Sequence, residues 1–286
     1  MQYRAAHTTR YRYDAPVSQC HTEVRLTPRS LPWQRLIDRS ITTVPEAATV
    51  DEWKDYFGNT VSMLSIVESH DRFSIASVSS VLVEERPKPP ESDVAWEAAR
   101  DQLAAHASAD ALEAFEFVFD SPFVAAASEL ADYARPSFTA GRPLADAAGD
   151  LSHRIHTEFA YKPTSTAIDT PLLEALRDRR GVCQDFSHVM IGALRSLGLA
   201  ARYVSGYLRS GADYQGAEAS HAWVSVFVPG AGWLDFDPTN DVTPGTGHVT
   251  LAWGRDYADV APITGIALGG GQQAVEVEVR VEAVEG

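Results

Sequence analysis

Three residues in the second half of the chain have types and contexts that suit nucleophilic chemistry. Cys183 follows a glycine and a valine in the stretch GVCQDF, His221 opens the run HAWVSVFV, and Asp237 ends the next run, GWLDFDP. A thiol is a good nucleophile as its thiolate, and an imidazole oriented by a carboxylate can take and return the proton. The set therefore predicts covalent chemistry at a cysteine.

A helix is predicted to begin at Cys183. Apolar residues recur with a 3.6-residue period from Phe186 to Leu197, and Gly198 ends the run. The first turn of a helix carries partial positive charge, and a neighbouring imidazolium adds to it. Together these two effects bring cysteine pKa values from about 8.5 down to roughly 3.5 to 7.5. The position therefore predicts an activated thiol.

The histidine and the aspartate are expected to meet through a hairpin. Residues 220–229 and 232–238 are alternating or β-branched runs separated by a tight Pro-Gly turn. If the two strands are antiparallel, their far ends lie together, which brings His221 beside Asp237. Asp235, two residues earlier on the same strand, is expected to point the same way.

The pattern before the cysteine divides the chain. Residues 1–85 hold short alternating runs separated by Pro, Gly-Asn or His-Asp turns, which predicts an antiparallel β module. The run RPKPPESD at 86–93 reads as a linker. Residues 94–250 form the predicted core, and residues 251–286 a C-terminal extension with one last half-exposed edge strand in AVEVEVRVEAV.

Helical spacing dominates the first half of this core. Apolar residues three or four apart predict helices in four segments, at 94–107, 121–134, 143–159 and 170–180. With the strands that follow the cysteine, the chain is therefore predicted to be an α+β protein in which helices pack on an antiparallel sheet.

Composition excludes several classes of partner and site. With 286 residues, 45% of them hydrophobic, and a net charge of -15, the chain can bury a large core, and its charge argues against nucleic acid. No signal peptide or membrane-spanning run is visible, so we expect a cytoplasmic protein without membrane contact. Two cysteines provide neither a disulfide framework nor a thiolate zinc site, and we expect no metal.

The three stretches GVCQDF, SHAWV and WLDFDPTN, in this order and at these spacings, resemble the nucleophile, histidine and acid motifs of the transglutaminase-like cysteine enzymes of the papain-type superfamily. The stretches RLTPRSLPWQ and DYFGNTV are similar to the N-terminal module of the bacterial members, and HVTLAWGRDYADVAPITG to their C-terminal part. The resemblance covers nearly the whole chain.

The resemblance implies a papain-like core, no cofactor, and a peptide or protein substrate. It implies that Cys183 attacks a carboxamide or peptide carbonyl, that His221 shuttles the proton, and that Asp237, at the position of the family's Asp-Pro-Thr, orients His221. The backbone N–H of Cys183 and the side chain of Tyr161 are candidate oxyanion donors. If water accepts the acyl group, the enzyme is a protease or amidase; if an amine accepts it, the enzyme is a crosslinker. The sequence does not indicate the oligomeric state.

Other interpretations remain open from the sequence. A pseudoenzyme could keep the fold to bind peptides, although binding would not require all three residues. A zinc hydrolase would need more ligands than His153 and His156 supply. His188 lies on the predicted helix of Cys183 and is not expected to replace His221, and Cys20 is expected to be structural.

Two tryptophans and one loop can be explained by structure alone, without a role in the reaction. Trp223 and Trp233 are expected in the core of the hairpin rather than as substrate platforms. The Gly-containing loop at 210–219 is either a rim of the cleft or a simple connector.

Overall fold

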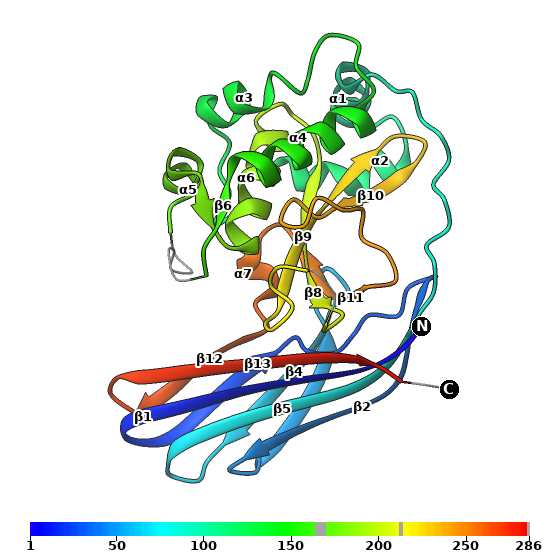
Figure 1. Cartoon of the computed structure of the whole chain (residues 1–286). Helices are drawn as coiled ribbons and strands as arrows, with labels where there is room; N and C mark the ends of the chain where they lie inside the picture. Colours follow the sequence, from blue (N-terminus) through cyan, green and yellow to red (C-terminus); the bar gives the residue numbers. More distant parts are fainter. Residues whose placement is uncertain (164–169, 212–213, 285–286) are drawn as a thin grey trace.

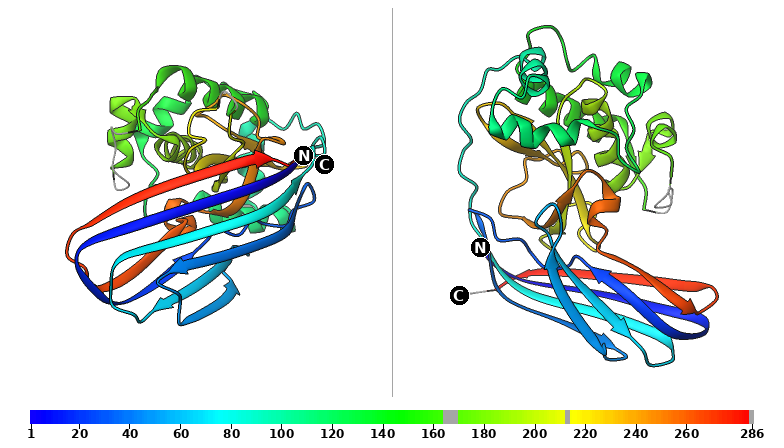
Figure 2. Two further views of the ribbon diagram at one scale, coloured as in Figure 1. Left: turned by 60° about the horizontal axis from the view of Figure 1, so that its bottom comes forward. Right: turned by 180° about the vertical axis from the view of Figure 1, so that it is seen from behind.

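The computed structural model describes residues 1–163, 170–211 and 214–284. A helical part with a small antiparallel sheet stands on a larger antiparallel sheet, which confirms the predicted α+β class and the N-terminal β module (Figures 1 and 2). The N–H of Val284 donates to the carbonyl of Gln2 at 2.9 Å. The two ends of the described chain therefore lie side by side at one end of the module (Figure 1).

The N-terminal module is built around one long strand, β1 (Gln2–Val24). β5 (His70–Val83) and β4 (Thr60–Ile66) pair with successive parts of β1, and β2 (Gln34–Val44) and β3 (Thr49–Lys54) lie outside them. All of these pairings are antiparallel. Alternate residues are buried along β1 and β5, as the period of a half-buried strand requires.

The C-terminal part of the chain returns to this module. β12 (Ile263–Gly269) and β13 (Gln273–Ala283) both pair antiparallel with β1, on the side away from β4 and β5. β13 confirms the strand predicted in the valine–glutamate tail, whereas no alternating pattern indicated β12. The last described residues therefore belong to the same sheet as the first.

The small sheet of the helical part has the order β10-β9-β8-β11. Its strands are β8 (Ala201–Leu208), β9 (His221–Val228), β10 (Gly232–Phe236) and β11 (His248–Gly254). β9 and β10 pair antiparallel, with Phe236 opposite Val224, which confirms the predicted hairpin.

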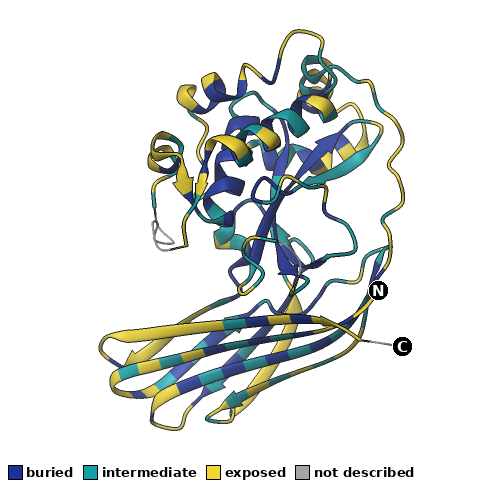
Figure 3. Cartoon of the chain, viewed as in Figure 1, coloured by how far each residue is buried: buried dark blue, intermediate teal, exposed yellow. Residues whose placement is uncertain are grey.

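Helices cover this sheet, and α6 (Cys183–Arg195) is the most deeply placed of them. Every residue of α6 except Gln184 is buried, and the helix packs on β9, β8 and α3 (Figure 3). The other helical segments are α1 (Trp96–Ala104), α2 (Ala109–Phe115), the 3₁₀ turn η1 (Glu116–Val118), α3 (Ser128–Ala134), α4 (Leu144–Glu158), α5 (Leu172–Asp178) and α7 (Tyr257–Val260). Two short strands, β6 (Ala160–Tyr161) and β7 (Arg180–Gly181), flank α5.

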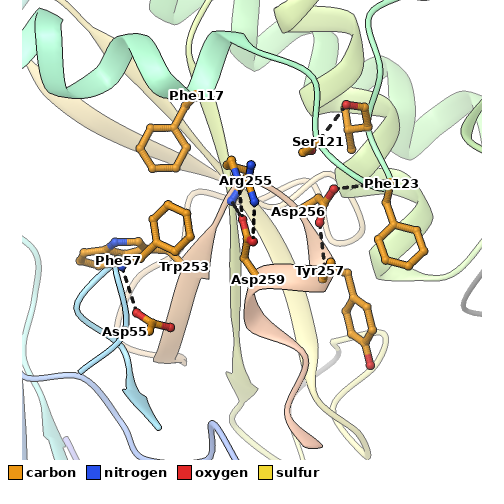
Figure 4. A network of polar contacts seen from close by, with 12 residues as sticks. Asp55, Phe57, Phe117, Ser121, Phe123, Trp253, Arg255, Asp256, Tyr257 and Asp259 are labelled. Atoms are coloured by element: carbon orange, nitrogen blue, oxygen red, sulfur yellow. Dashed lines mark hydrogen bonds and ion pairs between the residues drawn. The ribbon is translucent and has the colours of Figure 1, made fainter. Parts of the chain in front are cut away.

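The helix predicted over residues 121–134 is wrong in its first half, because α3 begins only at Ser128. Asp256 accepts a hydrogen bond from the N–H of Phe123 at 2.6 Å, and the hydroxyl of Ser196 accepts one from Ala127 at 3.0 Å. These distant side chains take the backbone donors of the segment. Figure 4 shows Asp256 with Phe123, at the turn where Arg255 and Asp259 form an ion pair.

The N-terminal module closes the outer edge of the small sheet. Gln34 bonds both the N–H and the carbonyl of Thr250 on β11, at 2.8 and 2.7 Å. Asn59 bonds the N–H and the carbonyl of Trp253 in the same way, at 3.0 and 2.9 Å. Two side-chain amides thus take the place of a neighbouring strand along β11.

Candidate active site

Cys183 is the first residue of α6, as predicted. Val182 precedes it in an extended conformation, and the N–H of Val182 donates to a carboxylate oxygen of Asp185 at 2.8 Å. This contact satisfies a backbone donor at the helix start and fixes the turn that presents the sulfur. The residue is buried, with 8% of its surface exposed, and the sulfur lies 4.0 Å from the carbonyl oxygen of Ser220.

His221 is the first residue of β9 and is almost completely buried. Its Nε2 lies 2.8 Å from a carboxylate oxygen of Asp237. The other ring nitrogen, Nδ1, has no partner at ordinary hydrogen-bond distance in the described part of the chain. Burial opposes the charged ring, but Asp237 and the nearby sulfur of Cys183 outweigh it and raise the pKa of His221 to about 10.

Asp237 lies directly after β10 and is fully buried. One carboxylate oxygen faces His221, and the other accepts the backbone N–H groups of Thr239 and Asn240 at 3.0 and 3.2 Å. Burial would raise the pKa of this acid, but the charge and hydrogen bond of His221 lower it overall. Asp237 therefore stays ionised and holds His221 protonated.

Two residues of this cluster were not predicted. His248, the first residue of β11, places Nε2 3.3 Å from the same oxygen of Asp237 that faces His221. The side-chain amide of Asn240 donates to that oxygen at 2.9 Å. His248 could have been suspected because, like His221, it is the first residue of an apolar run. Asn240 could have been suspected because it ends the acid motif WLDFDPTN.

Asp235 has a separate role from Asp237. Its carboxylate pairs with Arg86 at 2.5 Å and accepts the indole N–H of Trp223 at 3.0 Å. Trp223 is the alternate residue to His221 on β9, so the two acids contact neighbouring positions on the same side of the hairpin, as their spacing predicted. Arg86 lies in the segment predicted as a linker, which therefore contacts the core.

Tyr161 lies on β6, near the Nδ1 atom of His221. A Cβ atom placed on Gly216 would be 3.1 Å from both the Tyr161 hydroxyl and His221 Nδ1, so both groups lie beside Gly216. Burial, with the charges of Cys183 and Asp237, raises the pKa of Tyr161 to about 12. The tyrosine thus remains a hydrogen-bond donor near the sulfur.

The remaining histidines and the second cysteine lie elsewhere. His188 is buried on α6, stacks on Phe123, and accepts the N–H of Tyr257 at 3.2 Å. Burial lowers its pKa to about 4, so it stays neutral. Cys20 is buried in the module, 4.0 Å from His70, and burial raises its pKa.

His153 and His156 each contact a different group near the acid motif. His153 pairs with Asp241 at the surface at 2.7 Å, and His156 lies 2.9 Å from the carbonyl of Thr239. Within residues 1–163, 170–211 and 214–284, no three His, Cys, Asp or Glu side chains are grouped as metal ligands would be.

The predicted hairpin tryptophans and the loop can also be placed. Trp223 is fully buried, and Trp233 packs between Arg202 and Phe117 at the edge of the core. Of the loop at 210–219, residues 212–213 lie outside the described residues.

In the described part of the chain, no helix has the length and apolar character to cross a membrane.

Two family models match the chain. The bacterial transglutaminase-like N-terminal region matches residues 3–82, and the transglutaminase-like superfamily matches residues 131–238. An uncharacterized protein of Mycobacterium tuberculosis is 38% identical over 298 residues, covering 99% of this chain and 92% of its own length. A second uncharacterized relative, from Mycobacterium leprae, is 32% identical and covers 97% of both chains.

Two further similarities concern proteins with a stated activity. A protein-glutamine gamma-glutamyltransferase of Pseudomonas aeruginosa is 35% identical over 126 residues, which is 41% of this chain and 19% of that protein. The crystal structure of a candidate cysteine protease from Cytophaga hutchinsonii superimposes with a TM-score of 0.79 at 21% identity, covering 100% of this chain and 91% of that one. The second similarity establishes the fold.

Proposed function

The chain belongs to the transglutaminase-like superfamily, and from this membership we propose that it is a cysteine-dependent acyltransferase that hydrolyses amide bonds in peptides or isopeptides. The observation that carries the proposal is the arrangement around His221. Its Nε2 is bonded to a buried carboxylate, while Nδ1 is unpaired among the described residues and lies on the side of the sulfur of Cys183. This arrangement places a protonated ring beside the sulfur, where it can donate a proton to the leaving group.

The proposed reaction has two halves. The sulfur of Cys183 forms a bond to the carbonyl carbon of the substrate, the carbon–nitrogen bond breaks, and His221 gives its proton to the leaving nitrogen. Water then adds to the thioester while His221 takes a proton from it, and the acid leaves with Cys183 regenerated as thiolate. Asp237 keeps the ring oriented and stabilises its charged form in both halves.

The negative oxygen formed on the substrate needs hydrogen-bond donors. We assign the backbone N–H of Cys183 at the start of α6 as one donor and the Tyr161 hydroxyl as the second. The position of Tyr161 beside Gly216 and His221, and its raised pKa, support a neutral donor at this place.

Transfer to an amine instead of water is the second candidate. The similarity of 126 residues to the Pseudomonas aeruginosa protein-glutamine gamma-glutamyltransferase favours this possibility. The thioester would then react with a primary amine, such as a lysine side chain, with the same proton transfers through His221.

The test is a library of peptides and isopeptides incubated with the wild type and with Cys183→Ala. Loss of the nucleophile is expected to lower turnover by about four to six orders of magnitude with little change in stability. Cys20→Ala is the matched control, because it removes the other thiol from a place remote from the site, and it should retain turnover. Turnover that survives in Cys183→Ala would place the chemistry elsewhere.

Added primary amine separates the two acceptors. For each cleaved substrate, mass spectrometry of products formed with and without glycine ethyl ester measures the ratio of free acid to amine adduct. Predominance of the acid supports hydrolysis, and predominance of the adduct supports the crosslinking alternative.

The compartment is proposed to be the cytoplasm, with a peptide or protein as substrate. Both cysteines are free, which suits a reducing environment. The net charge of -15 supports the expectation that nucleic acid is not the partner.

A further inference from the structure

The connection between β8 and β9 brings a short backbone segment over the reactive pair. This rim segment, residues 214–220, lies at the end of the core nearest the module (Figure 1). Its last residue offers a carbonyl 4.0 Å from the sulfur of Cys183, and the carbonyl of Glu218 accepts the N–H of Val279 on β13 at 3.1 Å. A hydrogen bond to β13, a strand of the module's sheet, therefore anchors the segment.

Gly216 lies within the rim segment, beside His221 and Tyr161. Its φ is +86°, and an added Cβ would come within 3.1 Å of His221 Nδ1 and of the Tyr161 hydroxyl. The backbone here lies against the two groups that must reach the substrate carbonyl. A side chain at this place would compete for the space, and the positive φ also favours glycine.

Asn240 connects this rim segment to the acid. Its side-chain oxygen accepts the N–H of Gln215 at 2.7 Å, and its amide nitrogen lies 3.3 Å from the carbonyl of Gln215. The same amide nitrogen donates to Asp237 at 2.9 Å. One side chain thus bonds the catalytic acid and the residue before Gly216.

We propose that Asn240 is a positioning residue that holds the rim segment closed over Cys183 and so limits the size of the groups that reach the sulfur. The inference rests on the proposed function in taking Cys183 as the nucleophile. Loss of the bonds between Asn240 and Gln215 frees residues 215–217 of the rim segment, because the next described hydrogen bond along it is that of Glu218. Large acyl groups then reach the sulfur more easily, while small ones gain little.

The experiment compares two reagents with the same reactive group, iodoacetamide and tetramethylrhodamine iodoacetamide. Labelling of Cys183 is followed by mass spectrometry, and the measured quantity is the ratio of the rate constant for the large reagent to that for the small one. In Asn240→Ala we expect this ratio to rise at least about threefold over the wild type, because both bonds to Gln215 are lost.

A matched control variant keeps the result specific. Asp241→Asn changes the neighbouring residue, which pairs with His153 at the surface, and should leave the ratio unchanged. An unchanged ratio in Asn240→Ala, or an equal rise in Asp241→Asn, would overturn the proposal.

A measurement on the wild type does not depend on the thiol or on the folding of a variant. The Gln215 amide, bonded to Asn240, should exchange with solvent at least about tenfold more slowly than an unbonded loop amide by NMR. Unprotected exchange overturns the inference about Asn240. Failure of both reagents to label Cys183 in every variant, with Gln215 protected, would count against the proposed nucleophile and leave the role of Asn240 supported.

Discussion

His221 carries the charge on which the proposed chemistry depends. It is buried, and burial alone would make its ring neutral. Asp237, with its own charge stabilised by two backbone N–H groups, reverses this preference. The pKa of His221 in the folded protein is therefore above the value of about 6.5 that the unfolded chain has.

This difference predicts a dependence of stability on pH. Protonated His221 stabilises the fold fully below about pH 6.5, and the contribution is lost as the pH rises towards the folded value. Urea denaturation of the wild type should therefore show a free energy of unfolding that declines between pH 7 and about pH 10. In His221→Gln this part of the decline should disappear; an identical slope in both proteins would mean that the ring is not charged when folded.

Asp237→Asn tests whether the carboxylate bonded to His221 is needed for the proposed chemistry. Without the carboxylate, burial governs His221 and the ring is neutral at pH 7. Turnover should fall by about three to four orders of magnitude, as when the acid of a serine triad is replaced by its amide. Alkylation of Cys183 at pH 6 to 7 should slow as well, while Asp51→Asn on the exposed strand β3 should match the wild type. Full turnover in Asp237→Asn would exclude Asp237 from the site.

At the scale of elements, α6 presents Cys183 because its first turn is closed by Asp185. Gly181 makes room for this contact, since a Cβ atom there would lie 2.4 Å from a carboxylate oxygen of Asp185 and 2.7 Å from its Cβ. The glycine is thus required by a close approach to the side chain that caps the helix.

Gly181→Ala should therefore displace Asp185 and shift the start of α6. We expect a loss of about 1 to 3 kcal/mol in the free energy of unfolding, together with slower alkylation of Cys183. Gly245→Ala is the matched control, because an added Cβ there meets only one backbone oxygen, at 4.0 Å. Equal stability of the two variants would show that the turn adapts without cost.

At the scale of the molecule, the module is part of the core rather than an appendage. Tyr3, Ala5 and Val81 of the module, and Val279 of β13, belong to the same buried cluster as α6 and β9. Gln34 and Asn59, both in the stretches that resemble the bacterial N-terminal module, cover the backbone of β11. β11 in turn carries His248, which contacts Asp237.

Asn59→Ala should consequently destabilise the whole protein. The substitution leaves the N–H and carbonyl of Trp253 without these partners in a partly buried place, which costs roughly 2 to 5 kcal/mol for two such groups. Gln102→Ala, at an exposed position of α1, should change stability by less than about 0.5 kcal/mol. Thermal denaturation of the two variants measures the difference; a small loss in Asn59→Ala would show that water replaces the amide.

Much of this protein could be predicted from local pattern. The start of α6 at Cys183, the hairpin that joins His221 to Asp237, and the strand in the C-terminal tail follow from periodicity and turn residues, which act over a few neighbouring positions. The helix predicted over 121–134 was wrong in its first half, because Asp256 and Ser196, far along the chain, bind backbone donors there.

Only the tertiary structure decided which polar groups complete the site. His248 and Asn240 reach Asp237, and Gly216 lies against His221, through chain segments that meet after the sheet has formed. Their contacts depend on the burial of one carboxylate, whose lone pairs must be satisfied by whichever donors the fold brings near. The sequence by itself determined the candidate residues and the elements that carry them, because helix and strand periods are local. The groups that set the charge of His221 and the access to the sulfur of Cys183 come from distant parts of the sequence, so only the packed chain determines them.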